Sequence, residues 1–153
     1  MNKIKTLTEL KKIITKLKAV NKKIVFTNGC YDLIHPGHLG VLNFAKTKGD
    51  ILIVAVNSDS SIRKIKGPNR PIMSQKARSK ILENIEAVNY VILFSQKTPY
   101  SLIKQLRPDV LVKGGDWKRG EIIGNDIVEK VCRVKLLTGY STTKIIDKIK
   151  KNA

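Results

Sequence analysis

Two histidines lie three residues apart around a Pro-Gly pair in FTNGCYDLIHPGHLG, residues 26–40, directly after an apolar run. Pro36 suits a first helical position, and Gly37 lets a ligand approach the backbone closely. The spacing places the imidazoles of His35 and His38 on one side of a first helical turn. Helix N-terminal amides attract phosphate, and imidazole donors beside them would stabilise negative charge developing on phosphorus. The pattern favours a phosphate-handling site; structural histidines, or a metal site completed by carboxylates, remain alternatives.

Other common enzyme classes lack their fingerprints in this chain. There is no Walker A lysine loop, and no G-x-G-x-x-G follows the first apolar run. The two cysteines, Cys30 and Cys132, form no disulfide framework and indicate a reduced, cytoplasmic setting. The longest apolar run, residues 51–56, is far too short to span a membrane, and we expect no membrane partner.

The chain is strongly basic, with 30 Lys+Arg against 12 Asp+Glu and a net charge of +18. Such a charge is compatible with a nucleic acid, an anionic membrane or a polyphosphate ligand. The lysines are dispersed from Lys3 to Lys151 with few aromatic residues between them. This dispersal favours a solvated surface and no nucleic-acid partner, and a basic nucleic-acid-binding protein remains the remote alternative.

Apolar strands and amphipathic helices alternate along the chain. Thr6 and Glu9 have capping-box spacing and predict an amphipathic helix over 6–20, within a leader of residues 1–22 that precedes a domain of residues 23–153. Strands are predicted at 22–27, 50–56, 89–94, 109–115 and 133–137, and further helices at 36–49, 58–66, 75–88, 98–107, 119–131 and 141–152. The pattern predicts one Rossmann-like, doubly wound α/β domain with a parallel sheet of about five strands.

Polar, glycine-bearing segments follow four of the predicted strands. In open parallel sheets, ligands bind outside the carboxyl ends of the strands. The segments are residues 27–38, 57–61, 113–117 and 138–143. We therefore expect them to face one another across a single crevice.

The segments TNGCYDLIHPGH and GYSTTKI resemble the HxGH nucleotidyltransferase superfamily, which is cytidylyltransferase-like, over residues 24–149. Its members join a nucleoside monophosphate to a phosphorylated acceptor and release pyrophosphate. The blocks are most similar to D-glycero-β-D-manno-heptose 1-phosphate adenylyltransferases. The resemblance implies that this chain would be a stand-alone form, without the sugar kinase found in bifunctional heptose enzymes. This implies that ATP and a sugar 1-phosphate give ADP-heptose for lipopolysaccharide or another surface glycan. The alternative is glycerol-3-phosphate cytidylyltransferase, which typically has Thr-Phe-Asp where this chain has Cys30-Tyr31-Asp32.

The resemblance implies roles for individual residues. His35 and His38 would contact the α-phosphate. Lys66 would be a catalytic cation that closes on the triphosphate or the incoming sugar phosphate, and Arg78 would be a second catalytic cation. The implied nucleotide-binding residues are Thr27, Asn28, Gly29, Cys30, Gly37, Lys113, Gly114, Gly115, Asp116, Ser141, Thr142 and Thr143, and the implied acceptor-binding residues are Asp32, Asn57 and Asp59. Mg²⁺ would arrive with ATP, held mainly by the triphosphate and water, with no protein ligands assigned. Dimerisation is common among relatives, so a homodimer is compatible with the resemblance.

The residues themselves leave a structural role open at several positions. Asp32 could orient only neighbouring backbone groups, and Asn57 and Asp59 could be a turn residue and a helix cap. Lys66 could be one more solvated lysine, and Trp117 either a lid or a packing residue.

Overall fold

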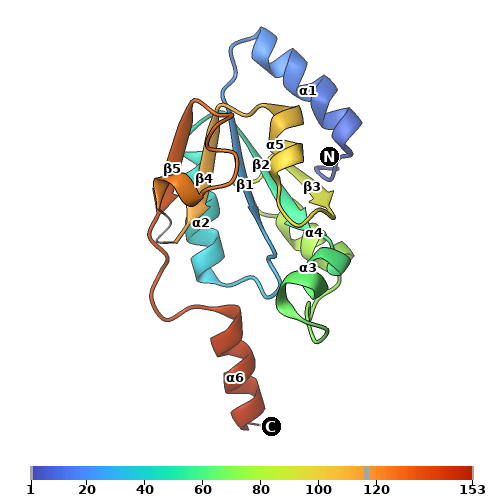
Figure 1. Ribbon diagram of the computed structural model, residues 1–153, viewed down its shortest axis with the longest axis vertical. Coiled ribbons are helices and arrows are strands. Elements are labelled where there is room, and N and C mark those ends of the chain that lie inside the picture. Colours follow the sequence, from blue (N-terminus) through green and yellow to red (C-terminus); the bar gives the residue numbers. More distant parts are fainter. Residues whose placement is uncertain (1, 116–117, 153) are drawn as a thin grey trace.

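The computed structural model describes residues 2–115 and 118–152 and has a five-stranded parallel sheet in the order β3-β2-β1-β4-β5 (Figure 1). The strands are β1 (Ile24–Gly29), β2 (Ile51–Asn57), β3 (Tyr90–Phe94), β4 (Val110–Gly114) and β5 (Lys130–Val134). The chain winds outward from β1 to β3 and then returns to the other side of β1. The strand order therefore reverses between β1 and β4, where a ligand crevice is expected. The predicted doubly wound fold is confirmed.

Helices cover both faces of the sheet. The α-helices of the described chain are α1 (Leu7–Ala19), α2 (Pro36–Lys46), α3 (Asp59–Lys66), α4 (Gln75–Glu83), α5 (Tyr100–Leu106) and α6 (Thr142–Asn152), of which α6 lies away from the sheet (Figure 1). One apolar cluster joins α1 and α5 to the sheet through residues such as Leu10, Phe26 and Ile103, all buried. A second cluster joins α2 and α4 to the opposite face through residues such as Leu42 and Leu82. This two-sided burial explains why the central strands are apolar throughout.

The first helix begins as its sequence predicts. The backbone amide of Glu9 donates to Thr6 Oγ1 at 3.3 Å, and the amide of Thr6 donates back to Glu9 Oε2 at 2.7 Å. Leu10 and Ile14 of α1 are buried in the core of the domain. The leader helix therefore contributes to the same hydrophobic core as the sheet.

The predicted helix over 119–131 is wrong. The structure has only a 3₁₀ turn there, at Arg119–Glu121, and β5 begins at Lys130, three residues before its predicted start at 133. Gly124 has a φ of +89°, and a Cβ added there would lie 2.8 Å from Ile103 Cδ1. Only glycine fits this left-handed position against α5, and such a residue interrupts a helix. The helix predicted over 75–88 likewise ends earlier, at Glu83.

The C-terminal helix α6 extends away from the body of the domain, below the sheet in Figure 1, and none of its residues is buried. Within residues 2–115 and 118–152, no helix is long and apolar enough to cross a bilayer.

Candidate active site

The junction between β1 and α2 places both histidines at the carboxyl edge of the sheet. After β1 ends, Tyr31 takes a left-handed conformation with a φ of +51° and turns the chain toward α2. Its ring is 5% exposed, and its hydroxyl hydrogen-bonds to Thr27 on β1. Burial raises the pKa of the Tyr31 phenol, so this hydroxyl stays protonated and the turn stays anchored. His35 then occupies the N-cap of α2, and Pro36 is its first residue.

The two imidazoles stack on one another with ring centroids 3.9 Å apart and planes inclined by 29°. The backbone amide of His35 donates to Nδ1 of His38 at 3.3 Å. Because Nδ1 accepts, the neutral His38 ring carries its proton on Nε2. Burial, followed by the charges of His35 and Lys66, lowers the pKa of His38 to about 4, and burial also lowers the pKa of His35. At neutral pH both rings are therefore uncharged hydrogen-bonding groups.

Gly37 makes room for the ring of His35. A Cβ added at Gly37 would lie 2.9 Å from Cε1 and 3.0 Å from Nδ1 of that ring. Nδ1 of His35 is buried and has no hydrogen-bond partner among the described residues. Position 37 therefore needs glycine so that the His35 ring can take its observed place.

We expect Gly37→Ala to displace the His35 ring and lower kcat by about 10²-fold, a cost typical of a misplacement of about 1 Å. Alanine favours helix, so the melting temperature should stay close to that of the wild type. Gly40→Ala is the matched control in the same helix, because its new Cβ would meet only Leu137 Cδ1 at an ordinary 3.6 Å. Equal kcat values for the two variants would contradict this account.

The lowered pKa of His38 also predicts how stability depends on pH. Between about pH 6.5 and about pH 4, an unfolded chain binds a proton at this histidine that the folded chain does not. The free energy of unfolding should therefore fall as the pH decreases through that window. Urea unfolding at about pH 7 and about pH 5 measures the loss, which should be smaller in His38→Asn. An equal loss in the variant would assign the pH dependence to other groups.

Lys66 is the last residue of α3, and its positive charge contributes to the lowered pKa of His38. The structure thus brings this predicted cation within electrostatic reach of the histidine pair. Helix α3 is held at its start by Ser58, whose side chain accepts from the amide of Ser61 at 3.2 Å. Lys66 is followed by Gly67, whose φ of +95° turns the chain into the loop that leads to α4.

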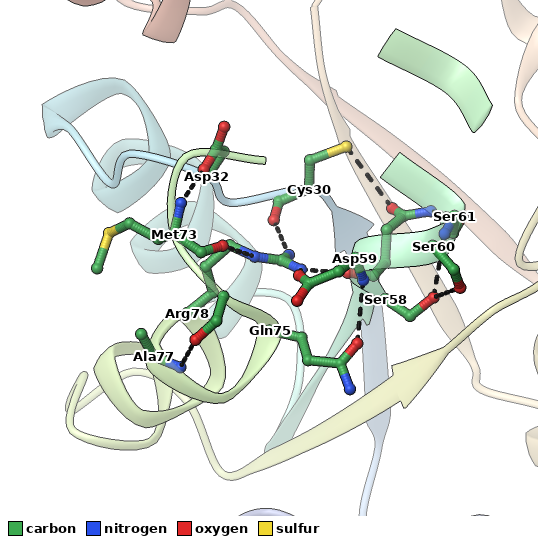
Figure 2. Close-up of polar contacts among 12 residues, drawn as sticks. Cys30, Asp32, Ser58, Asp59, Ser60, Ser61, Met73, Gln75, Ala77 and Arg78 are labelled. Atoms are coloured by element: carbon green, nitrogen blue, oxygen red, sulfur yellow. Dashed lines mark hydrogen bonds and ion pairs between the residues drawn. The ribbon is translucent and has the colours of Figure 1, made fainter. Parts of the chain in front are cut away.

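Arg78, the second catalytic cation that the resemblance implies, makes its contacts inside the protein. Its side chain is fully buried, and Figure 2 shows its guanidinium between three segments of the chain. It donates to the carbonyl oxygen of Cys30, to that of Asn57 at 2.8 Å and to that of Met73 at 3.0 Å, and it pairs with Asp59 Oδ1 at 2.8 Å. Arg78 therefore ties the ends of β1 and β2 to the loop before α4, and its Nε, Nη1 and Nη2 atoms all donate within the protein.

The three predicted acceptor residues also lie around this network. Asp32 is 2% exposed and accepts from the amides of Ile72 at 2.8 Å and Met73 at 2.9 Å and from Arg70 Nε at 2.7 Å. Burial opposes ionisation of Asp32, but these donors outweigh it and hold its pKa below the usual range. Its oxygens are therefore occupied by the protein itself, which is the backbone-orienting role left open above.

Asn57 and Asp59 are likewise engaged in internal contacts. Asn57 is buried and donates from Nδ2 to Ser61 Oγ at 3.0 Å. The side chain of Asp59 pairs with Arg78 but remains 24% exposed. Of the three predicted acceptor residues, Asp59 is thus the one with appreciable side-chain exposure to solvent. Arg70, to which the sequence analysis assigned no role, also belongs to this group of residues through its bond to Asp32. Its only sequence signal is its place in the GPNRP loop.

The ends of β1 and β4 carry several of the residues that the resemblance implies for nucleotide binding. Lys113 Nζ donates to Asn28 Oδ1 at 3.3 Å, and burial lowers the pKa of this lysine. Gly114 is closely packed, because an added Cβ would lie 2.8 Å from both Val41 and Leu136. Gly115 follows with a φ of +114°. The predicted residues Asp116 and Trp117 lie outside the described residues.

The start of α6 lies beside the histidines. The ring of Tyr140 is nearly parallel to that of His35, with centroids 6.4 Å apart and planes inclined by 19°. Ser141 then accepts from the amide of Lys144 at 3.1 Å at the start of the helix that contains Thr142 and Thr143. The structure therefore brings a helix N-terminus toward the two imidazoles from a distant part of the sequence, as the crevice prediction requires.

These features together define a doubly wound α/β domain with an uncharged histidine pair at its first strand-to-helix junction. The Cytidylyltransferase-like family matches residues 26–149, and the chain belongs to this family. The predicted resemblance is thereby confirmed.

Known proteins support this membership. The chain is 48% identical over 149 residues to "Bifunctional protein HldE" of Aliarcobacter butzleri, covering 97% of this chain and 31% of that protein. It is 48% identical over 140 residues to the protein of the same name from Wolinella succinogenes, covering 92% and 30%. The chain thus spans about a third of the length of these relatives.

Two solved structures are similar in fold. A lipopolysaccharide core biosynthesis protein from Thermoplasma volcanium superposes with a TM-score of 0.66 at 25% identity, covering 76% of this chain and 99% of that chain. A pantoate-β-alanine ligase from Francisella tularensis superposes with a TM-score of 0.63 at 16% identity, covering 99% and 78%. The second likeness concerns the fold alone.

Proposed function

We propose that this protein is an adenylyltransferase that joins AMP from ATP to D-glycero-β-D-manno-heptose 1-phosphate, giving ADP-heptose and pyrophosphate. The observation that carries the proposal is the stacked, uncharged pair of His35 and His38 at the N-terminus of α2, beside the start of α6. The similarity to HldE proteins and to a lipopolysaccharide core biosynthesis protein supports a sugar phosphate as the acceptor.

The reaction is an in-line displacement at the α-phosphorus of ATP. An oxygen of the sugar phosphate forms the new bond, the bond to the β-phosphate bridging oxygen breaks, and pyrophosphate leaves with that electron pair. A phosphate monoester dianion already carries a nucleophilic oxygen, so no general base is required. Catalysis then depends on positioning and on stabilising charge as it develops.

The residues of the crevice match these requirements. His38 presents an Nε2 proton that can donate to an α-phosphate oxygen, while the backbone amide of His35 fixes its tautomer. Lys66 supplies a positive charge near the pair, and the first turn of α6 supplies amides for the β- and γ-phosphates. We assign the nucleoside to the edge formed by Asn28, Lys113 and Gly114.

Mg²⁺ would neutralise charge on the triphosphate. Among residues 2–115 and 118–152, no group of three or more His, Cys, Asp or Glu side chains is placed to hold a metal. Asp32 and Asp59, the acidic residues of the network, already bind Arg70 and Arg78. These residues fit an ion held by the triphosphate and water better than one held by the protein.

The proposal is tested by pairing each of ATP and CTP with heptose 1-phosphate and with glycerol 3-phosphate and measuring pyrophosphate release. We expect release with ATP and heptose 1-phosphate alone. Release only with CTP and glycerol 3-phosphate would keep the chemistry and replace the substrates. Salt-sensitive binding of arbitrary polynucleotides, with no release in any mixture, would favour the nucleic-acid alternative.

A further inference from the structure

Arg70 lies in the loop between α3 and α4 and is held from two sides. Its Nε donates to Asp32 Oδ2 at 2.7 Å, and its side chain is 15% exposed. Its backbone amide donates to the carbonyl oxygen of Gly67 at 3.3 Å. The other oxygen of Asp32 accepts the amides of Ile72 and Met73. The loop and the guanidinium are therefore fixed by a single buried carboxylate.

The Nη groups of this guanidinium make no hydrogen bond to the described residues, and the side chain is 15% exposed. Within the part of the chain that the structure describes, Nε is the only atom of the Arg70 guanidinium that makes a hydrogen bond. Its two Nη groups carry four further N–H donors in a planar fork, the geometry that binds two oxygens of a phosphate. Arg78 is the opposite case, because its Nε, Nη1 and Nη2 all donate within the protein. Of these two arginines, Arg70 is the one that has donors left for a ligand.

Arg70 is linked to the two segments that carry His35, His38 and Lys66. Its partner Asp32 is three residues before His35 on the same β1–α2 connection. Its loop begins directly after Lys66, whose charge acts on His38. The guanidinium is thus tied to the connection that carries the histidine pair, and its backbone is tied to the residue that follows Lys66.

We propose that Arg70 binds a phosphate group of one of the two substrates and that Asp32 is the positioning residue that holds its guanidinium for this purpose. The inference rests on the proposed function only in that both substrates carry phosphate. It moves the second cation of the site from Arg78 to Arg70, and it gives Asp32 a role through Arg70 in place of direct contact with the acceptor.

The chain allows the two residues to be separated experimentally. Arg70→Gln removes the fork. Asp32→Asn can keep Oδ1 as the acceptor of the Ile72 and Met73 amides while it turns an NH₂ group toward Arg70 Nε, which releases the guanidinium. Arg63→Gln is the matched control, because Arg63 is an exposed arginine of neighbouring α3 whose side chain has no hydrogen-bond or ion-pair partner among the described residues.

The test is calorimetric binding of four probes: inorganic phosphate, heptose 1-phosphate, inorganic pyrophosphate and ATP. We expect Arg70→Gln to weaken binding of at least one pair of probes about 10-fold or more, the scale of a charge-assisted hydrogen bond, and Arg63→Gln to change none. Loss confined to the first two probes assigns Arg70 to the acceptor phosphate, and loss confined to the last two assigns it to the triphosphate. Arg70→Lys should recover part of the lost affinity, because it restores the charge without the fork.

Asp32→Asn should weaken the same probes as Arg70→Gln, and the double variant should be no weaker than Arg70→Gln alone. Melting temperatures show whether each variant folds. If Asp32→Asn does not fold, Arg70→Gln alone decides. Unchanged affinity of Arg70→Gln for all four probes would overturn the inference. Because binding is measured without turnover, a chain that makes no ADP-heptose but needs Arg70 for ATP would refute the proposed acceptor and leave this inference standing.

Discussion

His38→Ala is expected to lower kcat for pyrophosphate release by about 10³-fold, the cost of removing one preorganised donor from a developing negative charge. His38 donates from Nε2, because its Nδ1 already accepts from the amide of His35 at 3.3 Å. The ring also stacks on His35 at 3.9 Å, so its loss removes both a donor and a neighbour that positions the second imidazole. Steady-state kinetics with saturating substrates measure the effect.

Two further substitutions at this position separate the functions of the ring. Asparagine places an oxygen near the position of Nδ1 and keeps the acceptor for the His35 amide, but it lacks the Nε2 donor. Glutamine places an NH₂ group near the position of Nε2. We expect His38→Asn to be as slow as His38→Ala and His38→Gln to recover part of the rate, with melting temperatures close to the wild type. A His38→Asn variant of near-normal rate would contradict the role of Nε2.

Arg78→Met is expected to cause the largest loss of stability, about 3–5 kcal/mol, because it leaves three carbonyl oxygens without their donor and the 24% exposed carboxylate of Asp59 without its partner. The guanidinium is 0% exposed and joins the carbonyl oxygens of Cys30, Asn57 and Met73 to the carboxylate of Asp59. Methionine fills a similar volume but satisfies none of these groups. Urea unfolding measures the loss.

Lys80→Met is the matched control on the same helix. Lys80 also forms an ion pair, with Glu83 at 2.7 Å, but its side chain is 70% exposed. The Glu83 side chain is 9% exposed but keeps the amide of Lys3 as a donor at 2.9 Å. Surface pairs contribute less than about 1 kcal/mol, so this variant should unfold almost as the wild type does. If Arg78→Met were also that stable and lost only kcat, Arg78 would be the second catalytic cation that the resemblance implies, and its contacts would not stabilise the fold.

Most of the fold is predictable because its patterns are local. Continuous apolar strands alternate with helical periods, and the capping box of Thr6 and Glu9 starts α1 where it is predicted. The prediction fails at 119–131, where isoleucines mimic a helical period. There Ile122 packs into the core and Gly124 is held in a left-handed conformation against Ile103. That contact joins residues about 20 positions apart, so periodicity over a short window does not contain it.

The candidate site likewise has a part that the sequence predicts and a part that it does not. The histidine pair is a contiguous motif, and both its spacing and its place before a helix are visible in the sequence. Arg70 and Arg78 are of the same residue type and close in sequence, so their chemistry alone does not separate them. The difference is burial, for which one signal exists: Arg78 lies one helical turn before Leu82 and shares its buried face. The bond from Arg70 to Asp32 spans 38 residues and has no local signal.

The most direct test of the account is the conversion of ATP and D-glycero-β-D-manno-heptose 1-phosphate, with Mg²⁺, followed by ³¹P NMR. The account predicts that the two signals of a sugar nucleotide diphosphate and the signal of pyrophosphate appear in equimolar amounts with the wild type, and not with His38→Ala over the same time. An unchanged mixture with the wild type, or a product formed only when CTP and glycerol 3-phosphate replace these substrates, would contradict it.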